Sequence, residues 1–501
     1  MDTFSSLMMG FSVALAPTNL LFAFAGSLFG TVVGILPGLG PAAGTALLIP
    51  LTFHLDPTGA IIMLAAIYYG SQYGGTITSV LMNVPGEAAS AITCLDGYQM
   101  AKQGRAGAAL SIAAIGSFIG GTLATLGLVV AAQPLTKVAL RFGPVEFFAL
   151  TVLGIVLVMG LAGKSMIKAL IMAVFGLLIG MVGMDPTRGS PRFTFGLTEL
   201  LDGVGFIPVI MGLFGVAEVF ENLQEEGQQV IETTLSSLKP TAQDLKASGW
   251  AIGRGTVVGF LLGLVPGMTG TASSVLAYVA ERKSSKYPEK FGTGVIEGVA
   301  GPETANNAHA NAALIPLFTM GIPASPSIAV LMGAFMMNGL IPGPLLFKEH
   351  ASVAWGVIAS LYIGNVILLV LNLPLIPLWV KFLKIPYTIL MTIVLAVMMV
   401  GAYTVSNTVF DIFVMLLFGV IGYVLRKLDF PLAPIVLTLI MGPPMEKSLR
   451  QSLEMSQGDF SILVGSPIAA TLLAISAIIL LSPMFKYAWK RWVSQTRAQG
   501  A

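Results

Sequence analysis

Charged residues, cysteine and histidine are all scarce in this chain of 501 residues. Only 10% of its residues are charged and 55% are hydrophobic, whereas an average soluble domain carries about 25% charged residues. So few charges cannot cover a surface that faces water, so the apolar excess must face hydrocarbon. The single Cys94 excludes a disulfide framework, and three scattered histidines offer no metal-ligand spacing. The sequence therefore predicts an integral membrane protein without structural zinc.

A basic excess and enzyme motifs are also missing. Lys and Arg number 26 against 24 Asp and Glu, so nothing is available to neutralise a nucleic-acid backbone, and we expect no nucleic-acid partner. The chain has no H-E-x-x-H or G-x-S-x-G motif, and its GLAGKS segment has Val158 where a phosphate loop needs glycine. We therefore expect neither an enzyme nor an ATP-driven transporter. No Lys or Arg precedes Lys102, so the first apolar run lacks the basic start of a cleavable signal.

Long apolar runs are what the chain does contain. Each spanning helix takes roughly 20 apolar residues, so the runs predict an all-α polytopic membrane protein with about 10 to 12 spans, some of them broken or re-entrant. We predict a first membrane repeat over residues 1–220, a polar linker over 221–249, a second repeat over 250–485 and a basic tail over 486–501. The basic tail places the C-terminus in the cytoplasm by the positive-inside rule.

The two halves are related in detail. Five helix breakers of the first half recur in the second at a constant offset of 255 − 26 = 229. They are Gly26, Gly30, Gly34, Pro37 and Gly38, matched by Gly255, Gly259, Gly263, Pro266 and Gly267. Residues 79–90 (SVLMNVPGEAAS) align with 317–327 (LFTMGIPASPS) at an offset of 323 − 85 = 238. Lys102 and Arg105 follow the first motif, whereas the second is followed only by Lys348 beside Glu349, which is compatible with inverted repeats. The interrupted segments of such repeats mark a transporter's substrate site.

Each repeat carries a Pro-Gly break, in residues 34–50 (GILPGLGPAAGTALLIP) and 263–274 (GLVPGMTGTASS). Proline removes a backbone donor and glycine permits unusual φ and ψ angles, so both helices should break inside the membrane. Backbone groups freed in hydrocarbon are tolerated only where protein, water or a ligand completes them. The alternative is a kinked glycine face that packs two helices. The duplication favours a binding site.

A second pair of motifs places small polar residues ahead of another break, in residues 68–90 (YYGSQYGGTITSVLMNVPGEAAS) and 301–327 (GPETANNAHANAALIPLFTMGIPASPS). Two broken helices per repeat would form re-entrant hairpins. The helix that follows each proline leaves an N-terminus whose N–H groups and partial positive charge suit a carboxylate. The predicted substrate-binding residues are Pro37, Gly38, Gly40, Asn83, Pro85, Gly86, Ser90, Pro266, Gly267, Pro323, Ala324, Ser325 and Ser327.

Neutral oxygen-bearing side chains of the kind that hold Na⁺ lie in the same motifs. The predicted ion-binding residues are Ser71, Thr76, Thr78, Asn306, Asn307 and Asn311. The alternative is that these side chains only bond a neighbouring helix, at under about 2 kcal/mol each. No cofactor and no other metal is predicted, and the coupling ion is Na⁺ or H⁺.

Three ionisable residues, Glu87, Glu303 and His309, lie in or beside these motifs. An ionisable residue at membrane depth is a functional candidate by default. The alternative for both glutamates is that they cap helix N-termini near the interface, and we favour it for Glu87. His309 is either a proton site or a histidine bonded within the core.

These motifs together resemble the large membrane subunit of the tripartite tricarboxylate transporter family. The resemblance rests on GILPGLGPAAGTALLIP, YYGSQYGGTITSVLMNVPGEAAS, DGYQMAKQGRAG (residues 96–107), GLVPGMTGTAS and GPETANNAHANAALIPLFTMGIPAS, and it runs from about Phe24 to the last span without a departure in either motif pair. It implies an ion-coupled, elevator-like carboxylate importer of the bacterial inner membrane, with citrate as the best-known substrate. It also implies two partners, a small four-span membrane subunit and a periplasmic substrate-binding protein, and it places substrate and ion at the matched breaks.

A rival hypothesis is a membrane enzyme or lipid-handling protein whose glycine-rich helices line a cavity. It requires a paired acid-base or metal constellation, which this sequence lacks. A passive channel is a weaker third possibility, because paired re-entrant hairpins also occur in channels.

Overall fold

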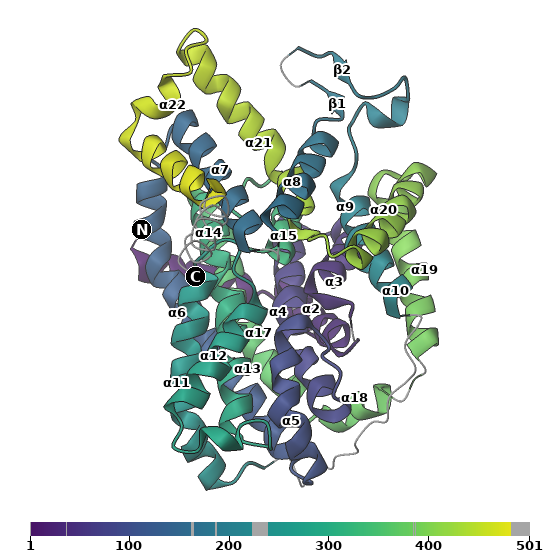
Figure 1. Cartoon of the computed structure of the whole chain (residues 1–501), viewed down its shortest axis with the longest axis vertical. Helices are drawn as coiled ribbons and strands as arrows, with labels where there is room; N and C mark the ends of the chain where they lie inside the picture. Colours follow the sequence, from purple (N-terminus) through teal and green to yellow (C-terminus); the bar gives the residue numbers. More distant parts are fainter. Residues whose placement is uncertain are drawn as a thin grey trace, which may run out of the picture. The chain divides into compact units, whose positions relative to one another are not determined.

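The computed structural model describes residues 2–36, 38–161, 165–185, 188–222, 239–383, 385 and 387–481. Over these residues the chain is almost entirely helical (Figure 1), which confirms the all-α prediction. The one strand pair described is short: β1 (Gly183–Met184) runs antiparallel to β2 (Pro191–Arg192). The predicted basic tail and residues 223–238 of the predicted linker lie outside the described residues.

The first half of the chain, up to Asn222, consists mainly of α-helices. They are α1 (Thr3–Ala14), α2 (Pro17–Ile35), α3 (Gly40–Leu48), α4 (Pro57–Met82), α5 (Thr93–Lys102), α6 (Ala106–Ala139), α7 (Pro144–Leu161), α8 (Met166–Gly180), α9 (Phe206–Ile210) and α10 (Ala217–Asn222), with 3-10 turns η1 (Ile49–Thr52), η2 (Ala88–Ile92) and η3 (Thr198–Leu200) and the π-helical turn η4 (Met211–Val216).

The second half of the chain also consists mainly of α-helices. Its helices are α11 (Ala242–Gly263), α12 (Gly270–Ser284), α13 (Glu297–Ala312), α14 (Leu314–Met320), α15 (Pro326–Met337), α16 (Pro344–Glu349), α17 (Ala351–Asn372), α18 (Ile376–Phe382), α19 (Tyr387–Ser406), α20 (Val409–Lys427), α21 (Ala433–Met455) and α22 (Ile462–Gly465), with the 3-10 turn η6 (Pro288–Lys290) and a last apolar helix over Pro467–Leu481.

Five of the described helices are long and apolar enough to span a membrane. They cover Pro17–Ile35, Ala106–Ala139, Ala351–Asn372, Ile389–Ser406 and Val409–Lys427. Other apolar runs, such as Pro326–Met337, form helices too short to cross alone because breaks interrupt them. The chain is therefore a multi-pass membrane protein in which several apolar segments are divided.

The chain folds into two compact units, each drawing on both halves of the sequence. One unit contains Met1–Leu140 and Gly205–Val424, and the other contains Arg141–Val204 and the chain from Leu425 onward. In the second unit, α7 and α8 pack on α21. Arg450 pairs there with Asp185 at 2.9 Å and with Glu446 at 2.7 Å, which ties the strand pair to α21. The matched motifs all lie in the first unit.

The repeat is visible as two equivalent helix pairs, α2 on α4 and α11 on α13. Three glycines of α2 and three of α11 lie so close to the partner helix that an added Cβ would collide with its backbone. The nearest partner residues are Met63, Ile67 and Ser71 for Gly26, Gly30 and Gly34, and Gly301, Ala305 and His309 for Gly255, Gly259 and Gly263. The partner residues differ by a constant 301 − 63 = 238. The two helix pairs therefore pack in the same register.

Both inner helices of these pairs carry polar residues and are nevertheless buried. Every residue from Gly59 to Leu81 of α4 and from Gly298 to Ala312 of α13 is buried. Figure 1 shows α13 within the bundle that it forms with α11 and α12. Because a buried polar group must be hydrogen-bonded, α4 and α13 must satisfy each other or their neighbours. They form a buried polar layer inside the apolar unit.

Asp96, the first residue of the DGYQMAKQGRAG motif, is fully buried at the start of α5 and ties the two halves together. Its carboxylate accepts bonds from the backbone N–H groups of Gly292, Gly294 and Val295 at 2.8–2.9 Å. It also accepts the Tyr278 hydroxyl at 2.8 Å. Four donors on one buried carboxylate fix the loop ahead of α13.

The start of α11 lies within the predicted polar linker. Thr241 and Asp244 form a capping box, which begins the helix at Ala242. Partial burial raises the pKa of Asp244, but hydrogen bonds from Thr241 and the Arg105 guanidinium lower it by more, so this pKa lies below its usual range. Arg105 thereby joins the start of α6 to the start of α11.

Candidate functional site

Glycines in the left-handed region break the chain at the predicted Pro-Gly motifs. Gly38 has φ 84° and Gly267 has φ 88°, so the matched positions adopt the same unusual conformation. Gly40, at φ 63°, begins α3, and Gly270 begins α12 behind the N-cap Thr269. Pro37 lies outside the described residues, while Pro266 is half-buried. Each break therefore ends one helix and starts a second. The start of α3 has no side-chain cap, whereas the Thr269 hydroxyl accepts the Ala272 N–H at the start of α12.

The second motif pair forms two matched tips. The helix α4 ends at Asn83 with φ 60°, and α14 ends at Gly321 with φ 72°. A short extended segment follows, through Pro85 and Gly86 in the first repeat and through Pro323 and Ala324 in the second. It leads to η2, capped by Glu87, and to α15, capped by Ser325. Both predicted helix N-termini are thus present.

The structure brings the second break against both tips. The Gly267 N–H donates to the Ala324 carbonyl at 2.9 Å. At Gly270 an added Cβ would lie 3.3 Å from Cβ of Ala89, in the first tip. The side chain of Ser325 is half-buried and Asn83 and Thr269 are exposed, so the tips remain accessible. The loop from Gly267 to Gly270 therefore bridges the tips of the two repeats.

The first break belongs to the same arrangement. Gly86 of the first tip lies against the Gly34 carbonyl, and its N–H donates to the Gly75 carbonyl at 3.4 Å. The helix that follows this break, α3, packs on α15 of the second repeat. In the same way α12 packs on η2. Each broken helix of one repeat thus contacts the tip helix of the other.

Two buried carboxylates lie behind the tips, each bonded by the opposite repeat. Glu87 accepts the Asn306 amide at 2.7 Å, and the amide nitrogen of Gln72, when it faces Glu87, lies 3.0 Å from the same carboxylate. Glu303 accepts both the Thr76 and the Thr93 hydroxyl. Within the described part of the chain, neither carboxylate forms an ion pair. All of these donors are neutral.

The predicted ion-binding residues do not meet at one point. Thr76 and Asn306 contact the two carboxylates, whereas Ser71 and Thr78 donate to carbonyls of their own helix. The other two bond α6. Asn307 donates to Ser117 at 2.7 Å and Asn311 to the Gly121 carbonyl at 2.9 Å, which is helix-to-helix bonding. Asn311 Oδ1 has no hydrogen-bond partner among the residues described.

Two predicted serines are buried. Ser90 donates to the Glu87 carbonyl at 2.9 Å and receives the Ser79 hydroxyl at 2.9 Å, so it completes the first tip. Ser327 is buried in the first turn of α15. Exposed hydroxyl chemistry therefore belongs to Ser325 and Thr269, and Thr269 was not predicted from the sequence. Thr269 stands just before the small residues that begin α12, and this position could have identified it as a helix cap in the sequence.

The ionisable candidates separate into different roles. Glu87 does cap a helix N-terminus, in a capping box with Ser90. Glu303 lies in the interior of α13, so the capping alternative fails for it. His309 bonds Ser273 at 2.9 Å within the core. Sequence reasoning missed Thr93 and Ser273 as partners. Thr93 lies outside the matched motifs, and Ser273 lies in the second Pro-Gly motif, where nothing in the spacing connects it with His309.

Comparison with known proteins gives two similar chains from Agrobacterium vitis. An uncharacterized 52.8 kDa protein in the TAR-I ttuC′ 3′ region is 46% identical over 97% of this chain and 98% of its own length. An uncharacterized protein in the TAR-II ttuC′ 3′ region is 44% identical over 44% of this chain and 92% of its own length. No solved structure is significantly similar. Residues 20–437 match the tripartite tricarboxylate transporter TctA family, so the chain belongs to that family, which is one of transporters rather than enzymes.

Proposed function

We propose that this chain is the translocating subunit of a secondary carboxylate importer, driven by a gradient of Na⁺ or H⁺. The substrate is a tricarboxylate such as citrate, or a related di- or monocarboxylate. The chain works in the bacterial inner membrane with its C-terminus in the cytoplasm. It acts with a small four-span membrane subunit and a periplasmic binding protein that delivers the substrate. Its family membership supports the tripartite arrangement.

The observation that carries the proposal is the pair of tips joined by the loop from Gly267 to Gly270. Helix N-termini carry free N–H groups and partial positive charge, which bind carboxylates without a cationic side chain. None of the four motifs contains Lys or Arg. The exposed Thr269 and half-buried Ser325 add hydroxyls at the same place. A carboxylate bound by these hydroxyl groups would leave in place the hydrogen bonds by which Thr269 caps α12 and Ser325 caps α15.

The coupling ion belongs, in this proposal, at the two buried carboxylates. An ionised carboxylate in a low-dielectric interior is very unfavourable unless a cation or proton accompanies it. Glu87 and Glu303 have only neutral donors among their described partners, so Na⁺ or H⁺ supplies the missing positive charge.

Transport would follow an elevator-like cycle in which the part that holds the substrate moves against a scaffold. Binding of the cation next to Glu87 removes a negative charge that would repel an incoming carboxylate near the same loop. Substrate and ion therefore favour each other, which is the thermodynamic requirement for symport. Release on the other side reverses both steps.

Uptake into proteoliposomes tests the proposal. The vesicles hold this chain and its small partner, and the binding protein and an inward Na⁺ or H⁺ gradient are added separately and together. We expect accumulation of at least one labelled carboxylate only when both are present. Replacement of Asn83 or Ser325 by Trp should abolish it, whereas Val257→Trp, at a site 57% exposed on α11, should not.

Two results would contradict the proposal. Normal uptake in both tip variants would remove the tips from the substrate path. No accumulation of any carboxylate by folded wild-type protein, combined with turnover of a membrane lipid, would favour the lipid-handling alternative. In that case the ligand that copurifies with the chain would identify the substrate.

A further inference from the structure

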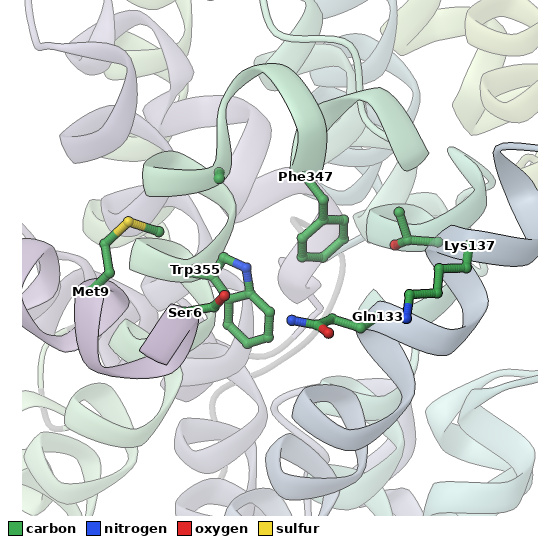
Figure 2. A pocket seen from close by; sticks show the side chains of 8 residues that line it. Ser6, Met9, Gln133, Lys137, Phe347 and Trp355 are labelled. Carbon is green, nitrogen blue, oxygen red and sulfur yellow. The ribbon is translucent and has the colours of Figure 1, made fainter. Parts of the chain in front are cut away.

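A cavity of about 300 Å³ lies between α1, α6 and the segment of α16 and α17. It is lined by Ser6, Met9, Gln133, Thr136, Lys137, Phe347, Ala351 and Trp355. Figure 2 shows the Phe347 and Trp355 rings beside it, with the Gln133 side chain extended toward Trp355 and Lys137 on the α6 side. Its volume is at the lower end for small-molecule sites. The walls combine one cation, polar groups and large apolar side chains.

Lys137 is the single charged residue of α6, a helix of 34 residues that qualifies as a membrane span. It stands in the last turn, and it makes no ion pair with the described residues. A cation at a helix C-terminus is favourable, and a lysine at the end of a span reaches the membrane interface. The cavity therefore presents an uncompensated positive charge at the level of lipid headgroups.

Thr136 gives a second, independent indication of a ligand. Its side chain is 93% buried, since its exposed fraction is 7%, and its hydroxyl has no hydrogen-bond partner in the described structure. Buried hydroxyls are normally bonded, so this donor lacks an acceptor. An anionic oxygen in the cavity would be attracted by Lys137. It would bond Thr136 after a rotation of that side chain, because the hydroxyl oxygen is itself buried.

The surroundings are apolar and face outward. Val130 and Val138 of α6 are 64% and 52% exposed, and Phe4 of α1 is 69% exposed. In a membrane protein such exposed apolar side chains contact lipid. The aromatic wall is rigid, because Phe347 packs edge-on to Trp355 at 5.8 Å and Gly10 of α1 lies directly against the Trp355 backbone. An acyl chain leaving the cavity would therefore continue along an apolar surface.

We propose that this cavity binds the headgroup of an anionic phospholipid. The phosphate oxygens would take the charge of Lys137 and the hydroxyl of Thr136, and the first methylene groups would lie against Trp355 and Met9. A free hydrophilic anion would use the cation but gain nothing from the apolar walls. Basic pockets between spans are the usual sites of such headgroups. None of the residues that line the cavity belongs to the transport tips.

Thermal unfolding of the delipidated full-length chain in a neutral detergent tests the site. We expect phosphatidylglycerol to raise the Tm by several degrees and phosphatidylcholine to have a much smaller effect. Lys137→Gln should remove most of the difference between the two lipids. Lys348→Gln is the matched control, because Lys348 is exposed next to Phe347 but does not line the cavity. Native mass spectrometry should show one retained anionic lipid in wild type and in the control, and its loss in Lys137→Gln.

A second variant keeps the test independent of charge. Ala351→Phe fills part of the cavity and leaves the charge of Lys137 in place, and it should also abolish the phosphatidylglycerol effect. Equal stabilisation by both lipids, or an unchanged lipid effect in both cavity variants, would overturn the proposal. Inorganic phosphate that reproduces the shift alone would indicate a free-anion site instead. If Lys137→Gln released the small membrane subunit and left lipid binding intact, the cavity would be a protein interface.

Discussion

The two repeats make the same left-handed turn at their tips, at Asn83 and Gly321, but they differ in the residue that caps the helix after it. Glu87 caps η2 and Ser325 caps α15, and these residues are equivalent at the offset 325 − 87 = 238. One tip therefore begins with a buried carboxylate and the other with a half-buried hydroxyl. A carboxylate at a helix N-terminus attracts cations and excludes anions, whereas a hydroxyl leaves the N–H groups available to an anion. The duplicated scaffold therefore carries an acidic cap at one tip and a neutral cap at the other.

The helices leading to the tips differ as well. In the first repeat α4 runs unbroken to Met82, while its counterpart is divided at Ala313 into α13 and α14. Both end in the left-handed region, at Asn83 in the first repeat and at Gly321 in the second. Asparagine tolerates this conformation and glycine adopts it without cost. The same turn is thus made by two residue types. The two repeats share the backbone conformation at this position but not the residue.

The largest effect should come from making the second tip resemble the first. Ser325→Asp keeps a good N-cap acceptor but places a negative charge where we propose that the substrate binds. At about 4 Å and an effective dielectric constant near 20, two like charges repel by about 4 kcal/mol, which is roughly a thousandfold in affinity. We expect carboxylate uptake in proteoliposomes to become undetectable.

Ser325→Asn is the matched control for this charge. Asparagine caps helices about as well as serine and aspartate but remains neutral. Uptake by Ser325→Asn should stay within about tenfold of wild type, since less than about 1.4 kcal/mol of binding is at risk. Equal uptake by the aspartate and asparagine variants would show that no anion approaches α15.

The reciprocal change, at the first tip, should affect coupling more than substrate binding. Glu87→Gln keeps an oxygen for the Asn306 amide but removes the charge that would hold the ion. Loss of a charged hydrogen-bonding partner costs about 1.5–3 kcal/mol, so gradient-driven accumulation should fall by about tenfold to a hundredfold. Exchange of internal for external substrate should persist, because it needs no net release of the ion.

Glu289→Gln, on the exposed turn η6, controls for the loss of an acid elsewhere in the chain. It should leave both accumulation and exchange unchanged. If Glu87→Gln accumulated substrate normally in the same gradient, the coupling ion would have to bind elsewhere. If the wild-type protein showed no uptake at all, the result would contradict the proposed transport function and would not test the assignment of the ion site to Glu87.

The sequence predicted the backbone of the site better than its side-chain partners. The matched glycines and prolines located the breaks, because few residues allow the conformations of Gly38 and Gly267. Thr76 was predicted as a site residue but its contact with Glu303 was not, and Thr93 was missed. Both threonines reach Glu303 from the other repeat, and sequence spacing does not reveal that contact. Polar residues on one buried helix look alike in sequence. Only the packing shows that Asn306 contacts a carboxylate while Asn307 bonds α6.

The compact units were not predicted either. Residues 141–204 and those from 425 onward join one unit although they come from different halves. Composition does not distinguish them, because both are apolar runs with short polar connections. Sequence periodicity finds repeats, whereas compact units depend on which helices pack together. A repeat boundary and a unit boundary are therefore different properties of this chain.

The smallest effect should fall equally on the two repeats, where they are most alike. Gly30→Ala and Gly259→Ala each place a methyl group against the backbone of the partner helix, at Ile67 and Ala305. Overpacking of this kind costs about 1–3 kcal/mol, so both variants should lower the Tm in detergent by similar amounts. Gly253→Ala is the control on α11, the helix that contains Gly259. An added Cβ at Gly253 meets nothing within 4 Å, and alanine favours a helix. A lower Tm for Gly259→Ala but not for Gly30→Ala would show that the two helix pairs contribute unequally to stability although they pack in the same register. Only the close packing of α11 on α13 would then be needed for the fold.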